Sequence, residues 1–227
     1  MDRKHYSVAV DGPSGAGKST LARALADELG ITYVDTGAIY RTIGYAVWQR
    51  GAAPDDASAV EALLPALDVT LAHGENGEQR MLLNGTDVTT KIRLPQISMY
   101  ASAVSALPCV RAYLLETQRS LARRQSVIMD GRDIGTVVLP EADVKIYLTA
   151  APTVRAQRRW LELRERGVQR PYHEVLDELM ERDYNDSHRA IAPLRCAEDA
   201  VAVDTSGLDF EQSRQALLRV IRERLER

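Results

Sequence analysis

The sequence predicts an α/β protein with a doubly wound, five-stranded parallel sheet core, an inserted lobe and a helical, arginine-rich lid. Short apolar runs alternate along the chain with stretches of helical periodicity, which is typical of βαβ units and a parallel sheet. Residues 60–93 interrupt this alternation with short β-like runs that are joined by turn sequences. A small antiparallel sheet inserted into the parallel core is the simplest interpretation of that interruption.

Five apolar runs predict the strands of the parallel sheet. Each is bounded by polar, Gly or Pro residues, and they span residues 6–11, 31–35, 126–130, 144–149 and 200–204. Between the first two runs, Leu21, Leu25 and Leu29 recur at every fourth residue and Gly30 follows as a stop signal, so a helix is expected here. Five such strands with intervening helices make a doubly wound core.

The inserted lobe is expected to contain a three-stranded antiparallel sheet over residues 69–73, 80–83 and 87–88. Its turns would be Glu75-Asn76-Gly77 and Asn84-Gly85, because Asn-Gly readily supplies the positive φ that tight hairpins need. Pro95 and Pro108 then introduce two helical stretches, residues 96–107 and 109–124. The last residues, 210–227, have the pattern of an amphipathic helix.

Composition and charge exclude several classes of function. Of the 227 residues 45% are hydrophobic, which is enough for a sizeable core. The 29 basic and 32 acidic residues leave a net charge of −3, so the chain lacks the electrostatic footprint of a nucleic-acid or anionic-membrane binder. No apolar run approaches the roughly 18 residues of a membrane span. We therefore expect no nucleic acid and no membrane among its partners.

The expected location of the protein is the cytoplasm. Two cysteines, Cys109 and Cys196, make no disulfide framework, which fits a reducing compartment. A strand and a glycine-rich motif already occupy residues 6–20, which argues against a signal peptide. No long coiled coil or exposed apolar block demands a partner chain, so we expect a monomer.

A complete phosphate-loop pattern, G-x-x-x-x-G-K-[ST], occupies residues 12–19, directly after a predicted strand and at the start of a predicted helix. Its glycines let successive backbone N–H groups point into an anion-binding nest, to which the helix N-terminus adds positive potential. We expect Lys18 to reach the β- and γ-phosphates of ATP and Ser19 to hold Mg²⁺, with Asp130 or Asp35 in the outer shell. The expected ATP-binding residues of the loop are Gly12, Pro13, Ser14, Gly15, Ala16, Gly17, Lys18, Ser19 and Thr20.

The phosphate loop alone leaves three classes open: a small-molecule kinase, a GTPase switch and an ATPase. The sequence has no N-K-x-D segment, by which GTPases read guanine. Asp130 is followed by Gly131-Arg132-Asp133 rather than by the acidic pair that is usual in motor or transporter ATPases. An arginine here favours a second anionic substrate beside the nucleotide phosphates.

Arginine supplies 25 of the 29 basic residues, and coding bias explains part of that excess. Three clusters nevertheless place arginine where a monophosphate acceptor could lie, because guanidinium groups bind phosphate bidentately. Residues 35–41 and 130–133 follow strands, at the sheet edge where doubly wound proteins bind ligands. Arg182, Asp186 and Arg189 fall at i, i+4 and i+7, so they share one face if a single helix contains all three.

Five segments together make the sequence resemble the bacterial cytidylate kinase family of nucleoside monophosphate kinases. They are D-G-P-S-G-A-G-K-S-T at 11–20, D-T-G-A-I-Y-R at 35–41, D-G-R-D-I-G-T-V-V at 130–138, A-D-V-K-I-Y-L at 142–148 and R-A-I-A-P-L at 189–194. The resemblance covers essentially the whole chain. It implies ATP-dependent phosphorylation of CMP and dCMP with Mg²⁺, and it makes the inserted lobe a monophosphate-binding lobe.

The resemblance also implies an acceptor site. Ser102, Arg111 and Asp133 would read cytosine, since a carboxylate accepts from the exocyclic amine while Ser and Arg can donate to the carbonyl and ring nitrogen. Arg182 and Asp186 would meet the ribose and the phosphate. The other members would bind the acceptor phosphate, and Thr36 among them replaces the more usual Ser while keeping the hydroxyl. The expected CMP-binding residues are Thr36, Arg41, Ser102, Arg111, Arg132, Asp133, Arg182, Asp186 and Arg189, and the expected catalytic residues are Lys18, Arg132 and Arg189.

The lid is expected over residues 151–172, with Thr153 as the N-cap of its helix and with Arg158 and Arg159 as contacts of ATP. Closure of this lid would exclude water from the transferring phosphoryl group. The expected domains are a phosphate-loop core (1–40, 111–150 and 190–227), the monophosphate-binding lobe (41–110), and the lid with its flanking helix (151–189).

Two alternatives remain open at this point. One is a kinase of another small acceptor, such as UMP, AMP or shikimate. The other is a non-enzymatic adaptor in which the phosphate loop only senses ATP. The second cluster of Arg and Asp residues argues against the adaptor, because a sensor would not need an acceptor site.

Overall fold

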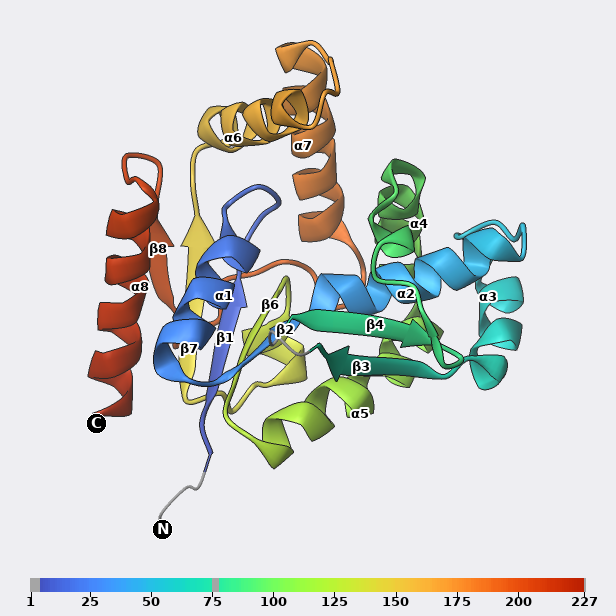
Figure 1. Ribbon diagram of the computed structural model, residues 1–227, viewed down its shortest axis with the longest axis horizontal. Helices are drawn as coiled ribbons and strands as arrows, with labels where there is room; N and C mark the ends of the chain where they lie inside the picture. Colours follow the sequence, from blue (N-terminus) through green and yellow to red (C-terminus); the bar gives the residue numbers. More distant parts are fainter. Residues whose placement is uncertain (1–4, 75–77, 227) are drawn as a thin grey trace. The chain divides into compact units, whose positions relative to one another are not determined.

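The five predicted strands form one sheet, with the order β2-β6-β1-β7-β8, in the computed structural model (Figure 1), which describes residues 5–74 and 78–226. The strands are β1 (Ser7–Asp11), β2 (Thr32–Asp35), β6 (Val127–Gly131), β7 (Val144–Thr149) and β8 (Val201–Asp204). β1 pairs in parallel with β6 and β7, and β7 pairs in parallel with β8. Asp11 lies opposite Gly131, so the segments that follow β1 and β6 start from the same edge of the sheet.

The contacts divide the chain into two compact units. The first unit runs up to Tyr33 and resumes at Gln125, and the second spans Val34–Arg124. In this division the helices at 152–188 belong with the phosphate loop, and the helix at 108–124 belongs with the inserted segment. The three-domain arrangement that the sequence suggests stays a prediction.

In the first unit, helices α1 (Lys18–Leu29) and α8 (Phe210–Leu225) pack together over the sheet. The core between them includes Val8, Leu25, Leu217 and Ile221, all fully buried. Burying an aliphatic side chain of this size contributes about 1.5–3 kcal/mol, so this layer is a main source of the unit's stability. Gly30 ends α1 with a positive φ of 64°, as its stop signal predicts.

Helices α6 (Pro152–Glu165) and α7 (Tyr172–His188) pack against each other beyond the carboxyl end of β7 (Figure 1). The same unit contains a π-helical turn, η3 (Ile134–Val138), directly after Asp133. π-Helical turns are rare and occur frequently at functional sites. The sequence pattern contains no signal for this turn.

In the second unit, the three-stranded antiparallel sheet is confirmed. It consists of β3 (Val69–His73), β4 (Gln79–Leu83) and β5 (Thr86–Asp87), in that order. Asn84 and Gly85 have φ values of 50° and 77°, as the predicted hairpin turn requires. The other predicted turn, Glu75-Asn76-Gly77, lies outside the described residues.

The helices of the same unit include α2 (Thr36–Gln49), which contacts β3 and β4 of that small sheet. The unit also contains α3 (Ala57–Leu63), α4 (Pro95–Ser105) and α5 (Pro108–Arg124), with short 3-10 turns η1 (Leu64–Ala66) and η2 (Lys91–Arg93). Both Pro95 and Pro108 begin their helices, one residue earlier than expected, because proline fits the first helical position. α2 and α4 approach closely at Gly44, where an added Cβ would lie 2.8 Å from the backbone N of Ala101.

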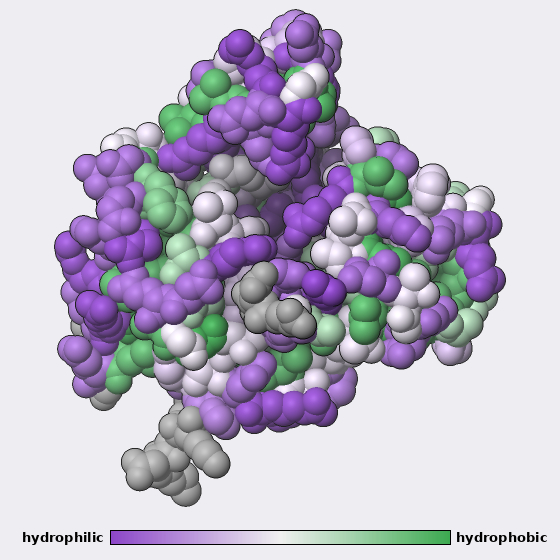
Figure 2. Space-filling model, viewed as in Figure 1, coloured by the Kyte–Doolittle hydropathy of each residue, from purple (hydrophilic) through white to green (hydrophobic). Residues whose placement is uncertain are grey.

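The surface agrees with the composition. Figure 2 shows that hydrophilic residues predominate on the face in view, with hydrophobic residues in small separate groups. Among residues 5–74 and 78–226, no helix has both the length and the apolar character that crossing a membrane would require.

Candidate active site

The glycine-rich loop after β1 has the backbone conformation of an anion-binding nest. Gly12, Gly15 and Gly17 have φ values of 150°, 74° and 88°. A Cβ on Gly12 would lie 1.9 Å from the backbone O of Leu148 in β7, so only glycine fits there. Because α1 begins at Lys18, its unpaired N–H groups and the positive end of its dipole adjoin the loop. This arrangement suits a phosphate group.

Lys18 is buried beneath this loop, and its Nζ donates a hydrogen bond to the backbone O of Pro13 at 2.7 Å. Burial lowers the pKa of Lys18 well below its ordinary value, and the charge of Arg132 lowers the pKa further. Three carboxylates oppose this effect, those of Asp130, Asp11 and Asp186. A bound polyanion would favour the ammonium form in the same way.

Ser19 and Asp130 form an oxygen-rich pair next to the loop. The Ser19 hydroxyl donates to Oδ2 of Asp130 at 2.7 Å, and the Tyr33 hydroxyl donates to Oδ1 at 2.9 Å. A hydroxyl beside a carboxylate is the hard-oxygen donor set that Mg²⁺ takes, so these side chains fit the ion. Tyr33 was not anticipated, since a tyrosine within a strand carries no signal for such a role. Thr20, the last residue expected at ATP, lies exposed on α1.

Asp11, at the end of β1, holds the chain that follows β6. Its two carboxylate oxygens accept hydrogen bonds from the backbone N of Ile134 at 2.8 Å and of Gly135 at 2.7 Å. Burial raises the pKa of Asp11 to about 6, although both of these hydrogen bonds lower it. The sequence analysis did not identify Asp11 as a functional residue. The signal that could have found it is an acidic residue at the end of a buried apolar run.

Arg132 forms a largely buried ion pair with Asp186, with 2.6 Å between Nε and Oδ2. Burial alone would lower the pKa of Arg132, but the charge and hydrogen bond of Asp186, together with the charges of Asp130 and Asp183, raise it. Burial likewise raises the pKa of Asp186, but Arg132 foremost, with Arg182 and Arg189, lowers it below its usual value. The structure therefore brings these four expected acceptor-site residues together.

Arg189 pairs with the other acid of this region, because its Nη2 donates to Oδ1 of Asp133 at 3.2 Å. Its Nε donates to the backbone O of Ala192 at 2.6 Å. The sequence placed Arg182, Asp186 and Arg189 on one face if a single helix contains all three. That condition is not met, because α7 ends at His188 and Arg189 is extended with ψ 142°. The backbone N of Arg189 still donates to the backbone O of Asn185, but the extended backbone of Arg189 takes the chain after it off the helix.

The arginines of α6 have different environments. Arg155 is 3% exposed and donates to the backbone O of Ala150 and of Ser14. Arg158 donates to the backbone O of Thr205 and of Leu208. Arg159 is exposed and forms a surface ion pair with Glu162. The contacts of Arg158 and Arg159 with ATP stay predictions.

Thr153 is not the N-cap of α6. The helix begins at Pro152, its cap is Ala151, and no side chain caps it. Pro152 explains this start: the first N–H groups of a helix have no partner within the helix, and proline, which has no N–H, fits that position.

The remaining acceptor-site candidates lie in the second unit. Thr36 is buried and opens α2, while Asp35 caps that helix by accepting from the backbone N of Ala38 at 2.9 Å. This capping role of Asp35 was not anticipated. Arg41 donates to the hydroxyl of Ser98 at 2.9 Å.

Ser102 and Arg111 belong to α4 and α5 of the same unit. Ser102 is half-buried on α4. Arg111 is 8% exposed, donates to the backbone O of Ser105 at 3.0 Å, and lies over the ring of Tyr40 at 5.6 Å. The structure thus shows a buried, oriented guanidinium at Arg111, and its contact with cytosine stays a prediction.

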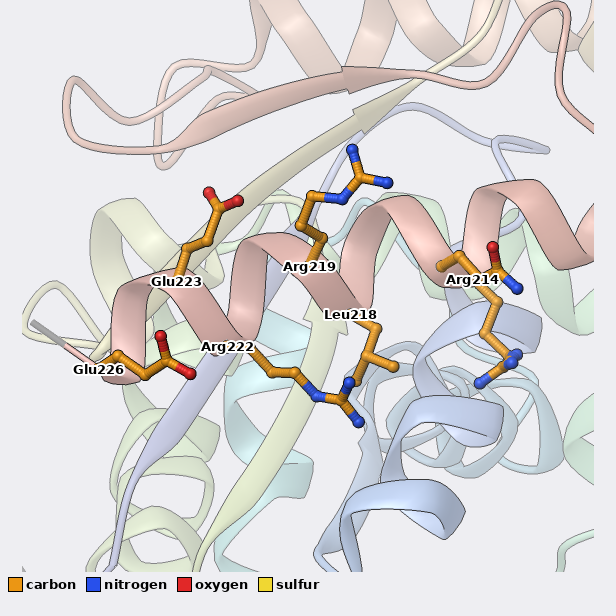
Figure 3. Close-up of a pocket in the computed structure, with 7 residues that line it drawn as sticks. Arg214, Leu218, Arg219, Arg222, Glu223 and Glu226 are labelled. Atoms are coloured by element: carbon orange, nitrogen blue, oxygen red, sulfur yellow. The ribbon is translucent and has the colours of Figure 1, made fainter.

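A separate hollow of about 450 Å³ lies along α8 in the first unit (Figure 3). Arg214 and Arg222 line it and pair with Glu28, and Leu218 contributes to the same wall. The hollow contains none of the expected site residues, and the guanidinium groups of Arg214 and Arg222 are paired with carboxylates.

Known proteins resemble this chain along nearly its whole length. The family model described as "Cytidylate kinase" matches residues 8–223. The cytidylate kinase of Caldicellulosiruptor bescii is 46% identical over 95% of this chain and 95% of that protein. The cytidylate kinase of Carboxydothermus hydrogenoformans is 49% identical over 94% of this chain and 96% of that protein.

The fold also has a counterpart among solved structures. An uncharacterized protein from Eubacterium ventriosum matches 96% of this chain and 99% of its own, with a TM-score of 0.52. The two sequences are 10% identical, so this likeness concerns the fold alone.

Proposed function

Since the chain belongs to the cytidylate kinase family, we propose that it transfers the γ-phosphoryl group of ATP to CMP or dCMP, which yields ADP and CDP or dCDP. It is a nucleoside monophosphate kinase, and therefore a transferase. The reaction is one displacement: the acceptor phosphate oxygen forms the new P–O bond while the bond to the β-phosphate oxygen breaks.

One observation supports this proposal most directly. Within the first unit, the phosphate loop follows β1 and the Arg132-Asp133 segment follows β6 at the same edge of the parallel sheet, and Asp186 and Arg189 pair with that segment. The phosphate loop is suited to a triphosphate, and Arg132 and Arg189 offer their guanidinium groups to another phosphate. Two phosphate-binding groups side by side are what phosphoryl transfer between nucleotides needs.

The donor end of the site consists of the loop and Lys18. Backbone N–H groups of residues 15–20 would bind the phosphates, and Lys18 would place its charge at the β- and γ-phosphates. Ser19 would hold Mg²⁺, with Asp130 behind it and Asp35 as the alternative carboxylate. When bound, the ion would neutralise charge on the phosphate oxygens during transfer.

At the acceptor end, four residues would bind the CMP phosphate and three would form hydrogen bonds with the base. Arg132 and Arg189 would bind the CMP phosphate with Thr36 and Arg41. In the resting protein the two arginines face carboxylates, which pre-orient the guanidinium groups. The base would be read by Asp133, Ser102 and Arg111. Arg182 and Asp186 would meet the ribose and phosphate.

Selectivity for cytosine follows from the chemistry of a carboxylate. Asp133 accepts hydrogen bonds, so it suits the exocyclic amine of cytosine and opposes the carbonyl of uracil. Closure of α6 and α7 over the nucleotide, with Arg158 and Arg159 at ATP, would keep water from the γ-phosphate. The proposal also includes a cytoplasmic, monomeric enzyme.

A coupled assay of ADP release tests the proposal. The protein would be given ATP, Mg²⁺ and in turn CMP, dCMP, UMP, AMP and shikimate. We expect CMP and dCMP to give the fastest turnover. If neither gives more ADP than buffer alone, the proposal fails, and faster turnover with another acceptor would reassign the substrate.

A further inference from the structure

The phosphate loop is held from outside by two helices, at residues that no phosphate-loop pattern specifies. Its apex, Ser14-Gly15, contacts both α6 and α7 in the first unit. A Cβ on Gly15 would lie 3.2 Å from Leu179 of α7 and 3.3 Å from the Cβ of Arg155 of α6. The apex of the loop is therefore packed against this helix pair.

Both backbone polar groups of Ser14 are engaged by side chains of these helices. Nη1 of Arg155 donates to the Ser14 carbonyl O at 2.8 Å. Oδ1 of Asp183 accepts from the Ser14 backbone N at 3.3 Å. The two side chains also pair with each other, with 2.6 Å between Nη1 of Arg155 and Oδ2 of Asp183. Two side chains and the backbone of one residue thus form a closed network.

Each side chain of this network is fixed independently of the loop. Nε of Arg155 donates to the backbone O of Ala150 at 2.7 Å, and the guanidinium side chain is 4% exposed. Asp183 is carried by α7, which is anchored one turn later where Asp186 binds Arg132. The Arg155 guanidinium is buried and hydrogen-bonded, and Asp183 lies on an anchored helix. Both side chains therefore keep a defined geometry.

The charges of the pair matter as much as its shape. A lone carboxylate at the N–H of Ser14 would place negative charge where a polyanionic ligand approaches. Arg155 neutralises that charge at 2.6 Å. We infer that Arg155 and Asp183 are positioning residues for ATP, which fix the apex of the phosphate loop and keep the holding carboxylate neutralised. This inference rests on the proposed function, because it assigns a role within its donor site.

Calorimetric titration with AMP-PNP and Mg²⁺, and separately with CMP, tests the inference in Arg155→Met, Asp183→Asn and the double variant. Arg155→Met leaves the carboxylate unpaired, so its AMP-PNP Kd is expected to rise about 10- to 100-fold. Asp183→Asn keeps the shape of the side chain and is expected to cost less, about 3- to 10-fold. The double variant is expected to bind more tightly than Arg155→Met alone, because no unpaired carboxylate remains.

The matched control is Asp177→Asn, an exposed carboxylate on the same helix, whose AMP-PNP Kd is expected to stay at the wild-type value. The CMP Kd is expected to stay within about twofold of wild type in all variants, whereas a merely structural role would shift both ligands together or neither. Unchanged AMP-PNP affinity in folded Arg155→Met and Asp183→Asn would overturn the inference. Wild-type protein that binds AMP-PNP but phosphorylates no CMP would instead overturn the proposed function.

Discussion

Charged side chains inside the first unit are tolerated because each is paired or hydrogen-bonded. The charges of Asp11, Asp130 and Asp186 act on Lys18, and those of Asp130 and Asp186 act on Arg132. The three acids and Lys18 are buried, and Arg132 is largely buried. Desolvating such charges is costly, and removing one partner of a buried pair typically costs about 3–5 kcal/mol. A protein that needed only a stable core would bury apolar residues here, so this cluster is better explained by ligand binding.

Because the pKa of Asp11 is raised in the folded chain, the free energy of unfolding depends on pH. This pKa is raised from 3.8 to about 6. The native state therefore holds this proton more tightly than the unfolded state does. Stability from this source is complete below about pH 4 and is lost as pH rises through about 6.

Asp11→Asn removes this titration and thus tests it. The free energy of unfolding of wild type, minus that of Asp11→Asn, is expected to fall by about 2 kcal/mol between pH 4 and pH 7, because the pKa of Asp11 is raised by about two units. Urea unfolding of both proteins at four pH values measures this difference. A constant difference across the range, or one that rises with pH, would contradict the assignment.

Asp133 is the residue on which selectivity for the base depends. Asp133→Asn replaces a pure acceptor by a group that also donates, so the kcat/KM ratio of CMP to UMP is expected to fall about tenfold or more. The variant also loses the charge that faces Arg189, so CMP binding weakens while AMP-PNP binding stays within about twofold. Equal losses of affinity for CMP and AMP-PNP, measured by calorimetry, would argue against reading of the base at this position.

At the scale of elements, the close approach of α2 to α4 depends on one glycine. Gly44 does not have a positive φ, so glycine is not needed there for its backbone conformation. It is needed because a Cβ would lie 2.8 Å from the Ala101 backbone N. Backbone cannot move aside as a flexible side chain can. Periodicity identifies such helices, but it does not reveal which of their residues must be small.

Gly44→Ala is expected to destabilise the protein by about 1–3 kcal/mol through overpacking of α2 against α4. Gly207→Ala is the matched control, because nothing lies within 4 Å of a Cβ at that position. Denaturant midpoints of the two variants, compared with wild type, measure the effect. Equal midpoints for Gly44→Ala and Gly207→Ala would refute the packing argument.

The strands, the hairpin at Asn84-Gly85 and the phosphate loop could be predicted because their signals are local. Apolar runs, turn dipeptides and glycine spacing act over a few residues, and the structure has each within one or two residues of its expected position. The Arg132–Asp186 and Arg155–Asp183 pairs could not be predicted, since their members lie 54 and 28 positions apart. Many acids in the sequence could have paired equally well with either arginine.

At the scale of the whole molecule, two compact units share the expected residues. The phosphate loop and the Arg132 and Arg189 pairs belong to the first, while Thr36, Arg41, Ser102 and Arg111 belong to the second. Phosphoryl transfer between two nucleotides requires the acceptor to be bound, oriented and sealed from water before reaction. In the proposed function residues of each unit are assigned to CMP, so substitutions in either unit are expected to weaken CMP binding.

The central claim is that the γ-phosphoryl group of ATP moves to CMP. Incubation with γ-³²P-labelled ATP, Mg²⁺ and CMP, followed by separation of the products, tests it directly. We expect label to appear in CDP in equal amount to the ADP formed, and Lys18→Ala to transfer it at least about 100-fold more slowly. Label that stays in ATP, or that appears only as inorganic phosphate while CMP is unchanged, would contradict the claim.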